Sequence, residues 1–475
     1  MPLDRRDFLK KTALATGAFA GWPRRRSAAS PPPFGIDMTG SVGPIDHVIV
    51  LMMENRSFDH YFGWLTGTKD QVFVDHPDDP SHPNHGQPVA THRLVPGDYR
   101  GCHHPDPSHS WNGGRLQLAQ GFLTGRNDEF AVGYYDEGDL DFYTALAGEF
   151  TLCDNYYCSV MGPTFPNREY MHSAQSGGLK DNSLPNAVPG HETGFTWPTI
   201  WDLCTVNDVP WGYYFVDLPA IGLWGRKHAH GAHHIENFFA DVQSGLLPNV
   251  SFVDPGFTTG LRTDEHPYSD VRAGQAFVHN VVKSVVESPL WPRTALFVNY
   301  DEWGGFFDHM LPPRAADVRA THQDAAGQND FGQLGFRVPC TLISPYARRG
   351  ALASEVVGDP AVYFEHCSIL GTIERIFLRG RHLTTRDAMA HDIGSRLLDL
   401  AQPPRLDAAQ IVDALPRSLV QSCPCDDEVL EGTFVGTPVE QGAGDGFEQL
   451  AEVVEDLSGI TIGRPQLSDI CGVLP

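Results

Sequence analysis

The sequence lacks any long hydrophobic segment and is poor in basic residues. None of its apolar runs approaches the about 18 residues that a membrane-spanning helix needs, so we expect no transmembrane segment. The 475 residues include 34 Lys and Arg against 59 Asp and Glu, which gives a formal net charge of −25. This charge disfavours nucleic acid as a partner and suits a protein that holds divalent cations.

Cysteine is also scarce. The chain has nine, an odd number, and no CxxC motif that pairs with a second one. A structural zinc site built from two such motifs is therefore not expected. In an oxidising compartment some of these cysteines are expected to form disulfides, and at least one is left over.

The first residues have the pattern of a bacterial export signal. Arg5 and Arg6 are followed by Phe8 and Leu9, a lysine pair and the weakly apolar stretch 12–22. We interpret residues 1–29 as a twin-arginine signal peptide, which predicts the twin-arginine export machinery as a partner and a periplasmic or secreted protein. Cleavage after Ala18-Phe19-Ala20 and cleavage near Ala28-Ala29 both remain open.

Buried strands and amphipathic helices alternate along the rest of the chain. Residues 46–53, 295–299 and 338–343 are short apolar runs between polar residues, which is typical of strands in a parallel sheet. Helical patterns occupy residues 270–286 and 365–378. This alternation predicts an α/β fold with a mainly parallel central sheet and helices on both faces.

The domain organisation predicted after the signal is one catalytic domain and one tail. Residues 30–402 form the catalytic domain, and residues 403–475 form an acidic C-terminal extension packed on it, with an amphipathic stretch at 446–457. Residues 64–135 are rich in His, Pro, Gly and Asp, and we expect them to form long loops that cap the site.

The first candidate site directly follows a predicted strand. Glu54 and Asn55 come after the run 46–53, and ligands of open α/β sheets bind at the carboxyl ends of the strands. A carboxylate and an amide oxygen there are suitable ligands for a hard divalent cation. The alternative is that Asn55 caps a helix, with Ser57 in its first turn.

A second strand ends in the same way. Asp301 and Glu302 follow the run 295–299 and precede a Gly-Gly turn with Asp308 and His309 beyond it. Three carboxylates gathered at one sheet edge repel one another unless a cation offsets their charge. Asp308 and His309 are expected to support these ligands from behind.

The third candidate is a threonine at the start of a predicted helix. Thr164 precedes Pro166, which we place at the first helical position of the segment NREYMHSAQS. A helix N-terminus favours negative charge, and a cation that also binds the threonine oxygen would make it a nucleophile. The alternative is a threonine that merely caps the helix, and the spacing Thr-x-Pro-x-Arg favours the functional interpretation.

Several motifs together resemble one known family. They are DHVIVLMMENRSFDHYFG, DPSHSW (106–111), LCDNYYCSVMGPTFPNREY, DEHP (264–267), NYDEWGGFFDH and GFRVPCTLISPYARRG (335–350). With these motifs in this order, the chain resembles the bacterial phosphoesterase family that contains phosphatidylcholine-hydrolysing phospholipases C and certain acid phosphatases. The resemblance covers roughly residues 46–378. The resemblance implies an alkaline-phosphatase-like fold.

The resemblance also assigns roles to individual residues. It implies that Thr164 is the nucleophile and forms a phospho-threonine intermediate, and that one of two histidines near the phosphate, His109 and His266, protonates the leaving group. A surface or structural role for either histidine stays open. The metal ligands that it implies are Glu54, Asn55, Thr164, Asp301 and Glu302. Oxygen ligands favour calcium, magnesium, manganese or iron.

The predicted function is therefore that of a metal-dependent phosphoric ester hydrolase. A phospholipase C that releases diacylglycerol and a phospho-headgroup is favoured, and an acid phosphatase acting on soluble phosphomonoesters is the alternative. A non-catalytic exported phosphate-ester binding protein is disfavoured because Thr164 and every ligand carboxylate are present. A sulfatase is disfavoured too, since the secondary alcohol of Thr164 cannot give the aldehyde that those enzymes need.

Overall fold

The structure, a computed structural model, describes most of the chain between residues 45 and 462. The described residues are 45–94, 98–102, 104–258, 262–317, 319, 330–408, 412 and 447–462. The predicted signal peptide, residues 1–29, lies outside them. None of the described helices is long and apolar enough to cross a membrane.

An eight-stranded sheet forms the centre of the fold, in the order β13-β6-β12-β11-β1-β10-β8-β9. At its middle, β1 (His47–Met53) pairs in parallel with β11 (Thr294–Tyr300) and with β10 (Val250–Asp254). Every residue of β11 and β10 is buried, as expected for parallel strands covered on both faces. The mainly parallel α/β fold predicted from the sequence is confirmed.

One predicted strand runs in the opposite direction. β12 (Cys340–Ile343) lies in the run 338–343 but pairs antiparallel with both of its neighbours, β11 and β6 (Thr151–Leu152). The chain between β11 and β12 has no crossover helix in its described residues, so it re-enters the sheet from the edge at which β11 ends. An antiparallel strand is the direct consequence.

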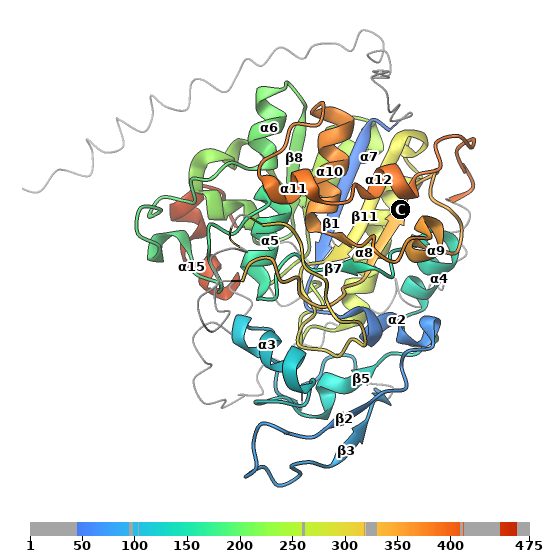
Figure 1. Cartoon of the computed structure of the whole chain (residues 1–475). Helices are drawn as coiled ribbons and strands as arrows, with labels where there is room; N and C mark the ends of the chain where they lie inside the picture. The colour runs from blue at the N-terminus through green and yellow to red at the C-terminus, as the bar shows by residue number, and fades with distance from the viewer. Residues whose placement is uncertain are drawn as a thin grey trace, which may run out of the picture.

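Helices cover both faces of this sheet. Figure 1 shows α5 (Thr164–Ser173) and α10 (His366–Phe377) on the near side of the sheet, with α7 (Ile235–Ser244) and α8 (Val271–Val286) behind it. The predicted helices 270–286 and 365–378 correspond to α8 and α10. Asp270 caps α8 by accepting a hydrogen bond from the amide of Arg272, which fixes its first residue.

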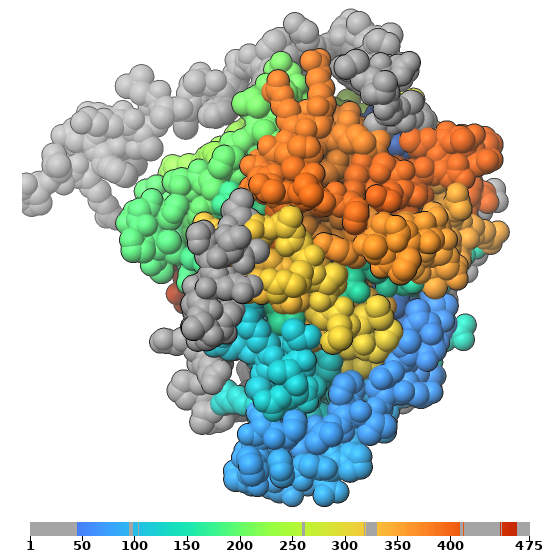
Figure 2. All heavy atoms as spheres, in the orientation of Figure 1, coloured from blue at the N-terminus to red at the C-terminus, as the bar shows by residue number. Residues whose placement is uncertain are grey.

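The regions predicted as capping loops contain regular structure. Residues 64–135 include the antiparallel hairpin of β2 (Val72–Val74) and β3 (Pro88–Ala90), which protrudes at the lower end of the molecule in Figures 1 and 2. They also include α3 (Trp111–Gln120), capped by Ser110. Two glycines weaken the helical pattern of α3, but Gly114 lets it approach Met161 and Trp303 closely.

The aromatic residues of region 180–235 are mostly core. Trp201, Tyr213, Tyr214, Phe215 and Trp224 are all buried. They belong to α6 (Ile200–Val206), β8 (Trp211–Phe215) and the 3-10 helix Ala220–Lys227. Farther along, the tail helix α15 (Phe447–Ser458) stacks Phe447 on Phe257 with 3.6 Å between ring centroids.

The remaining elements are short and lie around this core. The other strands are β4 (His92–Arg93), β5 (Gly133–Tyr134), β7 (Tyr156–Tyr157), β8 (Trp211–Phe215), β9 (Ala232–His234), β13 (Ala351–Leu352) and β14 (Phe364–Glu365). The other helices are α2 (Phe58–Thr66), α4 (Asp141–Glu149), α6 (Ile200–Val206), α9 (Ala353–Val357), α11 (Thr385–Met389) and α12 (Ile393–Leu397), with 3-10 helices at Glu129–Val132, Pro185–Ala187, Ala220–Lys227, Ala229–Gly231 and Trp291–Arg293. The six described cysteines form no disulfide with one another.

Candidate active site

Two predicted ligand pairs meet at the carboxyl edge of the sheet. Met53 lies opposite Tyr300 in the parallel pairing of β1 and β11, so Glu54 and Asp301 leave adjacent strands at the same level. The amide of Asp301 donates a 3.1 Å hydrogen bond to the carbonyl of Met53, and the amide of Glu54 donates one of 2.9 Å to Asp264. The register that buries the apolar strands therefore places both carboxylates side by side.

Asn55 lies next to them in an unusual backbone conformation. Its φ of 58° lies in the left-handed region, and its amide donates a 3.1 Å hydrogen bond to Oδ1 of Asp301. The helix that follows is capped by Ser57, which accepts from the amide of His60, so the alternative in which Asn55 is the cap is wrong. The Asn55 side chain is fully buried and its Oδ1 and Nδ2 make no hydrogen bond within the described residues.

A tight glycine turn joins Glu302 to this pair. Gly304 donates a 2.7 Å hydrogen bond to Oε2 of Glu302, and its φ is 64°. A β-carbon on Gly304 would overlap the carbonyl oxygen of Asn55, and one on Gly305 would overlap the backbone of Pro107. The Gly-Gly turn thus lets three backbone segments approach one another where the ligands converge.

Thr164 is the first residue of α5. Pro163 occupies the N-cap position, so the helix starts two residues before the predicted start at Pro166. The earlier start is fixed by Asn167, whose side-chain Nδ2 donates hydrogen bonds to the carbonyls of Val160 and Gly162 at 3.1 and 2.8 Å. Thr164 is therefore not the cap residue. Its Oγ1 is buried and makes no hydrogen bond to any residue that the structure describes.

Arg168, one turn further along α5, ties this helix to the strand ends. Its guanidinium lies 3.0 Å from Oε1 of Glu54, 2.8 Å from Oδ1 of Asp254 and 3.6 Å from Oδ2 of Asp301. Residues four apart share one face of a helix, so Thr164 faces the same edge as Arg168. The spacing Thr-x-Pro-x-Arg is thereby explained: the arginine docks the helix on the ligand carboxylates.

The site holds more negative charge than Arg168 can offset. Burial raises the pKa of Asp301 to about 6, although the positive charge of Arg168 lowers it. Burial, together with the neighbouring charges of Asp301 and Asp106, raises the pKa of Glu302 well above its usual range. A divalent cation fits this donor set because it would supply the missing positive charge. It would also bind buried oxygens that make no hydrogen bond to the residues the structure describes, namely Asn55 Oδ1, Thr164 Oγ1 and Glu302 Oε1.

The two predicted histidines lie together beside this edge. The ring centroids of His109 and His266 are 5.6 Å apart, and Nε2 of His266 lies 3.7 Å from Oδ2 of Asp106. One ligand atom from each of these three residues lies within 4.8 Å of the others. The Nδ1 atoms of His109 and His266 bond to the carbonyls of Pro107 and Pro267.

Asp308 and His309 belong to a different cluster. Asp308 accepts from Arg337 at 2.9 Å, while Nδ1 of His309 lies 2.6 Å from Asp59, which Arg337 also binds. The expectation that they support the Asp301 and Glu302 ligands is therefore wrong. The Gly-Gly turn lies between Glu302 and these residues, and they pair instead with Arg337 and with Asp59 of α2.

Three residues of the site were missed by the sequence analysis: Asp106, Arg168 and Asp254. Asp106 stands three residues before His109, and Arg168 completes the threonine motif, so both lay within patterns already noted. Asp254 ends the five-residue strand β10 as Glu54 follows β1. A search for every carboxylate at the end of a short apolar run would have found it.

Comparison with known proteins supports one family. Residues 45–378 match the sequence model of the Phosphoesterase family, and this range contains every residue of the site described above. Non-specific phospholipase C1 of Arabidopsis thaliana is 33% identical over 415 residues, which are 79% of this chain and 75% of the relative. Phospholipase C B of Mycobacterium tuberculosis is 31% identical over 492 residues, covering 87% and 90% respectively. A solved protein of the alkaline phosphatase superfamily from Vibrio parahaemolyticus aligns over 82% of this chain and 79% of its own, at 11% identity and a TM-score of 0.34.

Proposed function

Since the chain belongs to the Phosphoesterase family and is a phosphoric ester hydrolase, we propose that it is a phospholipase C. It hydrolyses phosphatidylcholine-type phospholipids to diacylglycerol and a phosphorylated headgroup. The observation that carries the proposal is that relatives named phospholipase C match this chain along most of both lengths.

Thr164 is the nucleophile in this proposal. Its oxygen attacks phosphorus in line with the diacylglycerol oxygen, so that the new P–O bond to Thr164 forms as the bond to diacylglycerol breaks. Water then hydrolyses the phospho-threonine and regenerates the deprotonated threonine oxygen. Support comes from the position of Thr164 at the N-terminus of α5, buried and without a hydrogen bond among the described residues.

A cation site accompanies the nucleophile. Glu54, Asn55, Asp301 and Glu302 are the residues that would hold a divalent metal, with the oxygen of Thr164 beside them. Such an ion would offset the negative charge of its ligands and stabilise the deprotonated threonine oxygen. The donors are all oxygens, which favours calcium, magnesium, manganese or iron.

The proton on the leaving group comes from the histidine pair. An imidazolium Nε2 of His109 or His266 donates its proton to the diacylglycerol oxygen, and the neutral ring then accepts a proton from the attacking water. The carboxylate of Asp106 lies 3.7 Å from Nε2 of His266.

The experiment that tests the function compares two chromogenic substrates. Purified protein is assayed on p-nitrophenylphosphorylcholine and on p-nitrophenyl phosphate, with and without chelator, and then on phosphatidylcholine vesicles. We expect chelator-sensitive cleavage of the choline diester and release of diacylglycerol. A preference for the monoester would identify an acid phosphatase instead, and activity on neither would favour a binding protein. The Thr164→Ala variant, purified identically, controls for contaminating phosphatases.

The chain organisation is part of the same proposal. Residues 1–29 direct export by the twin-arginine route, residues 30–402 form the catalytic domain and residues 403–475 form the extension packed on it. The enzyme would then act in the periplasm or outside the cell, where phospholipid substrates are accessible. Changing Arg5 and Arg6 to lysine should retain the protein in the cytoplasm, and unchanged export in cell fractions would contradict this assignment.

A further inference from the structure

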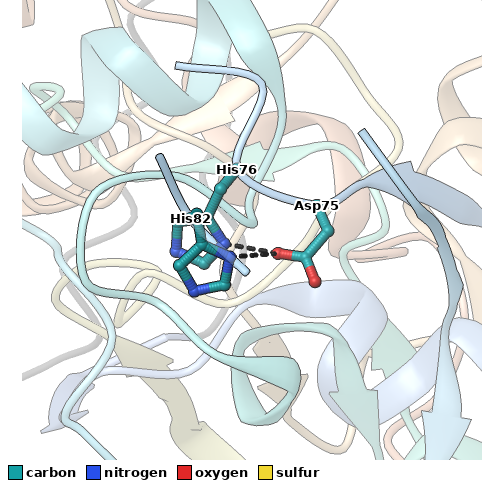
Figure 3. A group of neighbouring side chains, drawn as sticks. All are labelled: Asp75, His76 and His82. Atoms are coloured by element: carbon teal, nitrogen blue, oxygen red, sulfur yellow. Dashed lines mark hydrogen bonds and ion pairs between the residues drawn. The ribbon is translucent and has the colours of Figure 1, made fainter. Parts of the chain in front are cut away.

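A second cluster of metal-binding side chains lies on the β2–β3 hairpin. Asp75 directly follows β2, His76 is next to it, and His82 returns to them from the loop before β3 (Figure 3). One ligand atom from each of the three lies within 4.8 Å of the others. We propose that Asp75, His76 and His82 form a binding site for a divalent transition-metal ion such as Zn²⁺, separate from the catalytic edge.

The geometry of the two imidazoles supports a shared ion. Their rings stack with 3.6 Å between centroids and 16° between planes, and both Nδ1 atoms face Oδ1 of Asp75 (Figure 3). His76 is hydrogen-bonded to this oxygen, while Nδ1 of His82 is 3.8 Å from it. A proton bridges Asp75 to one ring at a time, whereas a metal ion binds both rings and the carboxylate together.

The spacing and protonation of these atoms suit metal binding. Ligand atoms about 2.0–2.2 Å from a tetrahedral zinc ion are roughly 3.3 Å apart, so a small rotation of His82 brings its Nδ1 to that separation. This nitrogen accepts a 3.4 Å hydrogen bond from the amide of Asn84, so it carries a lone pair and not a proton, and the same rotation would turn that lone pair from Asn84 to the ion.

The backbone holds the ligands in place on one side and leaves an approach on the other. The amide of Asp75 donates to Gln87, the amide of His76 donates to Leu123, and both bonds are 2.8 Å long. The side chains of His76 and Asp75 are 7% and 11% exposed, whereas that of His82 is 30% exposed. An ion would therefore enter past His82 and complete its coordination with solvent water.

The donor set distinguishes this site from the catalytic edge. Two imidazole nitrogens and one carboxylate favour zinc and its transition-metal neighbours, whereas the oxygen donors around Glu54 and Asp301 favour harder cations. The hairpin also protrudes at the lower end of the molecule, away from the main sheet (Figures 1 and 2). The ion would fasten the two ends of the segment 75–82 and stabilise this protrusion.

The test measures zinc on the full chain, without a polyhistidine tag. The protein is stripped with chelator, dialysed against Zn²⁺ in excess Ca²⁺, and its zinc content is measured by elemental analysis. We expect the wild type to hold about one equivalent more zinc than His82→Ala. His85→Ala is the control and should retain the wild-type zinc content. His85 belongs to the same loop and is exposed, and within this cluster its imidazole contacts only the backbone carbonyl of His76.

A second variant and a second readout keep the result decisive. Asp75→Asn preserves the shape of the carboxylate, and it should lose the same equivalent of zinc while circular dichroism stays unchanged. Added Zn²⁺ should raise the melting temperature of the wild type more than that of either variant. Equal zinc content in the wild type and the folded variants would overturn the proposal and leave a hydrogen-bonded cluster only. Phosphodiester turnover should be the same in His82→Ala and the wild type, so failure here is separable from failure of the catalytic assignment.

Discussion

The Arg168 guanidinium lies 3.0 Å from the Glu54 carboxylate, and both side chains are fully buried. This ion pair joins the helix that begins with Thr164, the proposed nucleophile, to the strand end that carries Glu54, a proposed metal ligand. Asp254 and Asp301 contact the same guanidinium at 2.8 and 3.6 Å. Arg168 thus holds the start of α5 against these carboxylates and offsets part of their negative charge.

Replacing Arg168 by methionine should destabilise the protein strongly. The substitution leaves buried carboxylates without their cation, a change that costs on the order of 3–5 kcal/mol. The free energy of unfolding in urea measures the loss. Arg314→Met is the matched control, because Arg314 pairs with Asp330 while 48% of its side chain is exposed, and about 0–1 kcal/mol is expected there. Equal effects of the two substitutions would contradict the role of Arg168.

Replacing Thr164 by alanine should abolish turnover and leave the fold intact. The hydroxyl makes no hydrogen bond within the described residues, so its removal breaks no described structural contact. We expect a loss of kcat on the order of a thousandfold or more, with an unchanged melting temperature. Thr164→Ser keeps the hydroxyl and should retain most of the activity. A folded alanine variant with near-normal kcat would rule out Thr164 as the nucleophile.

Replacing Asp301 by asparagine should lower the metal content of the purified enzyme. Because burial raises the pKa of Asp301 to about 6 when no cation is present, protons should also displace the metal from the wild type as the pH falls below about 6. Elemental analysis after dialysis at several pH values measures both effects. Asp308→Asn is the control, since Asp308 binds Arg337, and it should lower stability without removing the metal. Unchanged metal content in Asp301→Asn would remove this residue from the ligand set.

Replacing Gly304 by alanine should disrupt the turn beside Glu302. Gly304 has a φ of 64°, and a β-carbon there would overlap the Asn55 carbonyl oxygen. The left-handed conformation alone costs a non-glycine residue roughly 1–2 kcal/mol, and the overlap adds to it. The melting temperature and kcat should both fall. Gly138→Ala, where a β-carbon meets nothing within 4 Å, should behave like the wild type. Wild-type stability and kcat in Gly304→Ala would contradict the close approach of Gly304 to the Asn55 carbonyl oxygen.

Because of Glu265, the free energy of unfolding should fall as the pH rises. Three tyrosine hydroxyls, those of Tyr61, Tyr143 and Tyr300, donate to its carboxyl group, and burial raises its pKa from 4.5 to about 7. The folded state therefore keeps a proton that the unfolded state loses above pH 4.5, so the stabilisation is complete below pH 4.5 and disappears as the pH rises through 7. It amounts to roughly 3 kcal/mol.

The Glu265→Gln variant isolates this effect. Glutamine cannot titrate, so the difference in unfolding free energy between pH 4.5 and pH 8 should shrink by most of that amount relative to the wild type. Equilibrium urea unfolding at both pH values provides the comparison. An identical pH dependence in the variant would show that Glu265 does not carry the effect.

The sequence predicts that Glu54 and Asp301 lie side by side because two local patterns combine there. The apolar runs that end before Glu54 and Asp301 mark buried strands, and parallel strands place their following residues at one edge. The parallel order of β1, β11 and β10 then follows from the fold class. The threonine motif likewise predicts a helix start, although Asn167 shifts it to Thr164 itself.

What the sequence does not reveal depends on contacts between distant segments. The antiparallel direction of β12 follows from the route of a long connection, and the pairing of Asp308 with Arg337 follows from the turn at Gly304. The cluster of Asp75, His76 and His82 has no recognised motif spacing, and only the folded hairpin brings its three side chains together. These contacts cannot be predicted from the order of the residues alone.

The stereochemical course at phosphorus tests the central claim most directly. A substrate with a chiral, isotopically labelled thiophosphoryl group is hydrolysed by the wild-type enzyme, and the configuration of the product is determined by phosphorus NMR. Attack by Thr164 followed by attack of water is two in-line displacements, so the account predicts retention of configuration. Inversion would mean a single direct attack by water and would contradict the phospho-threonine intermediate.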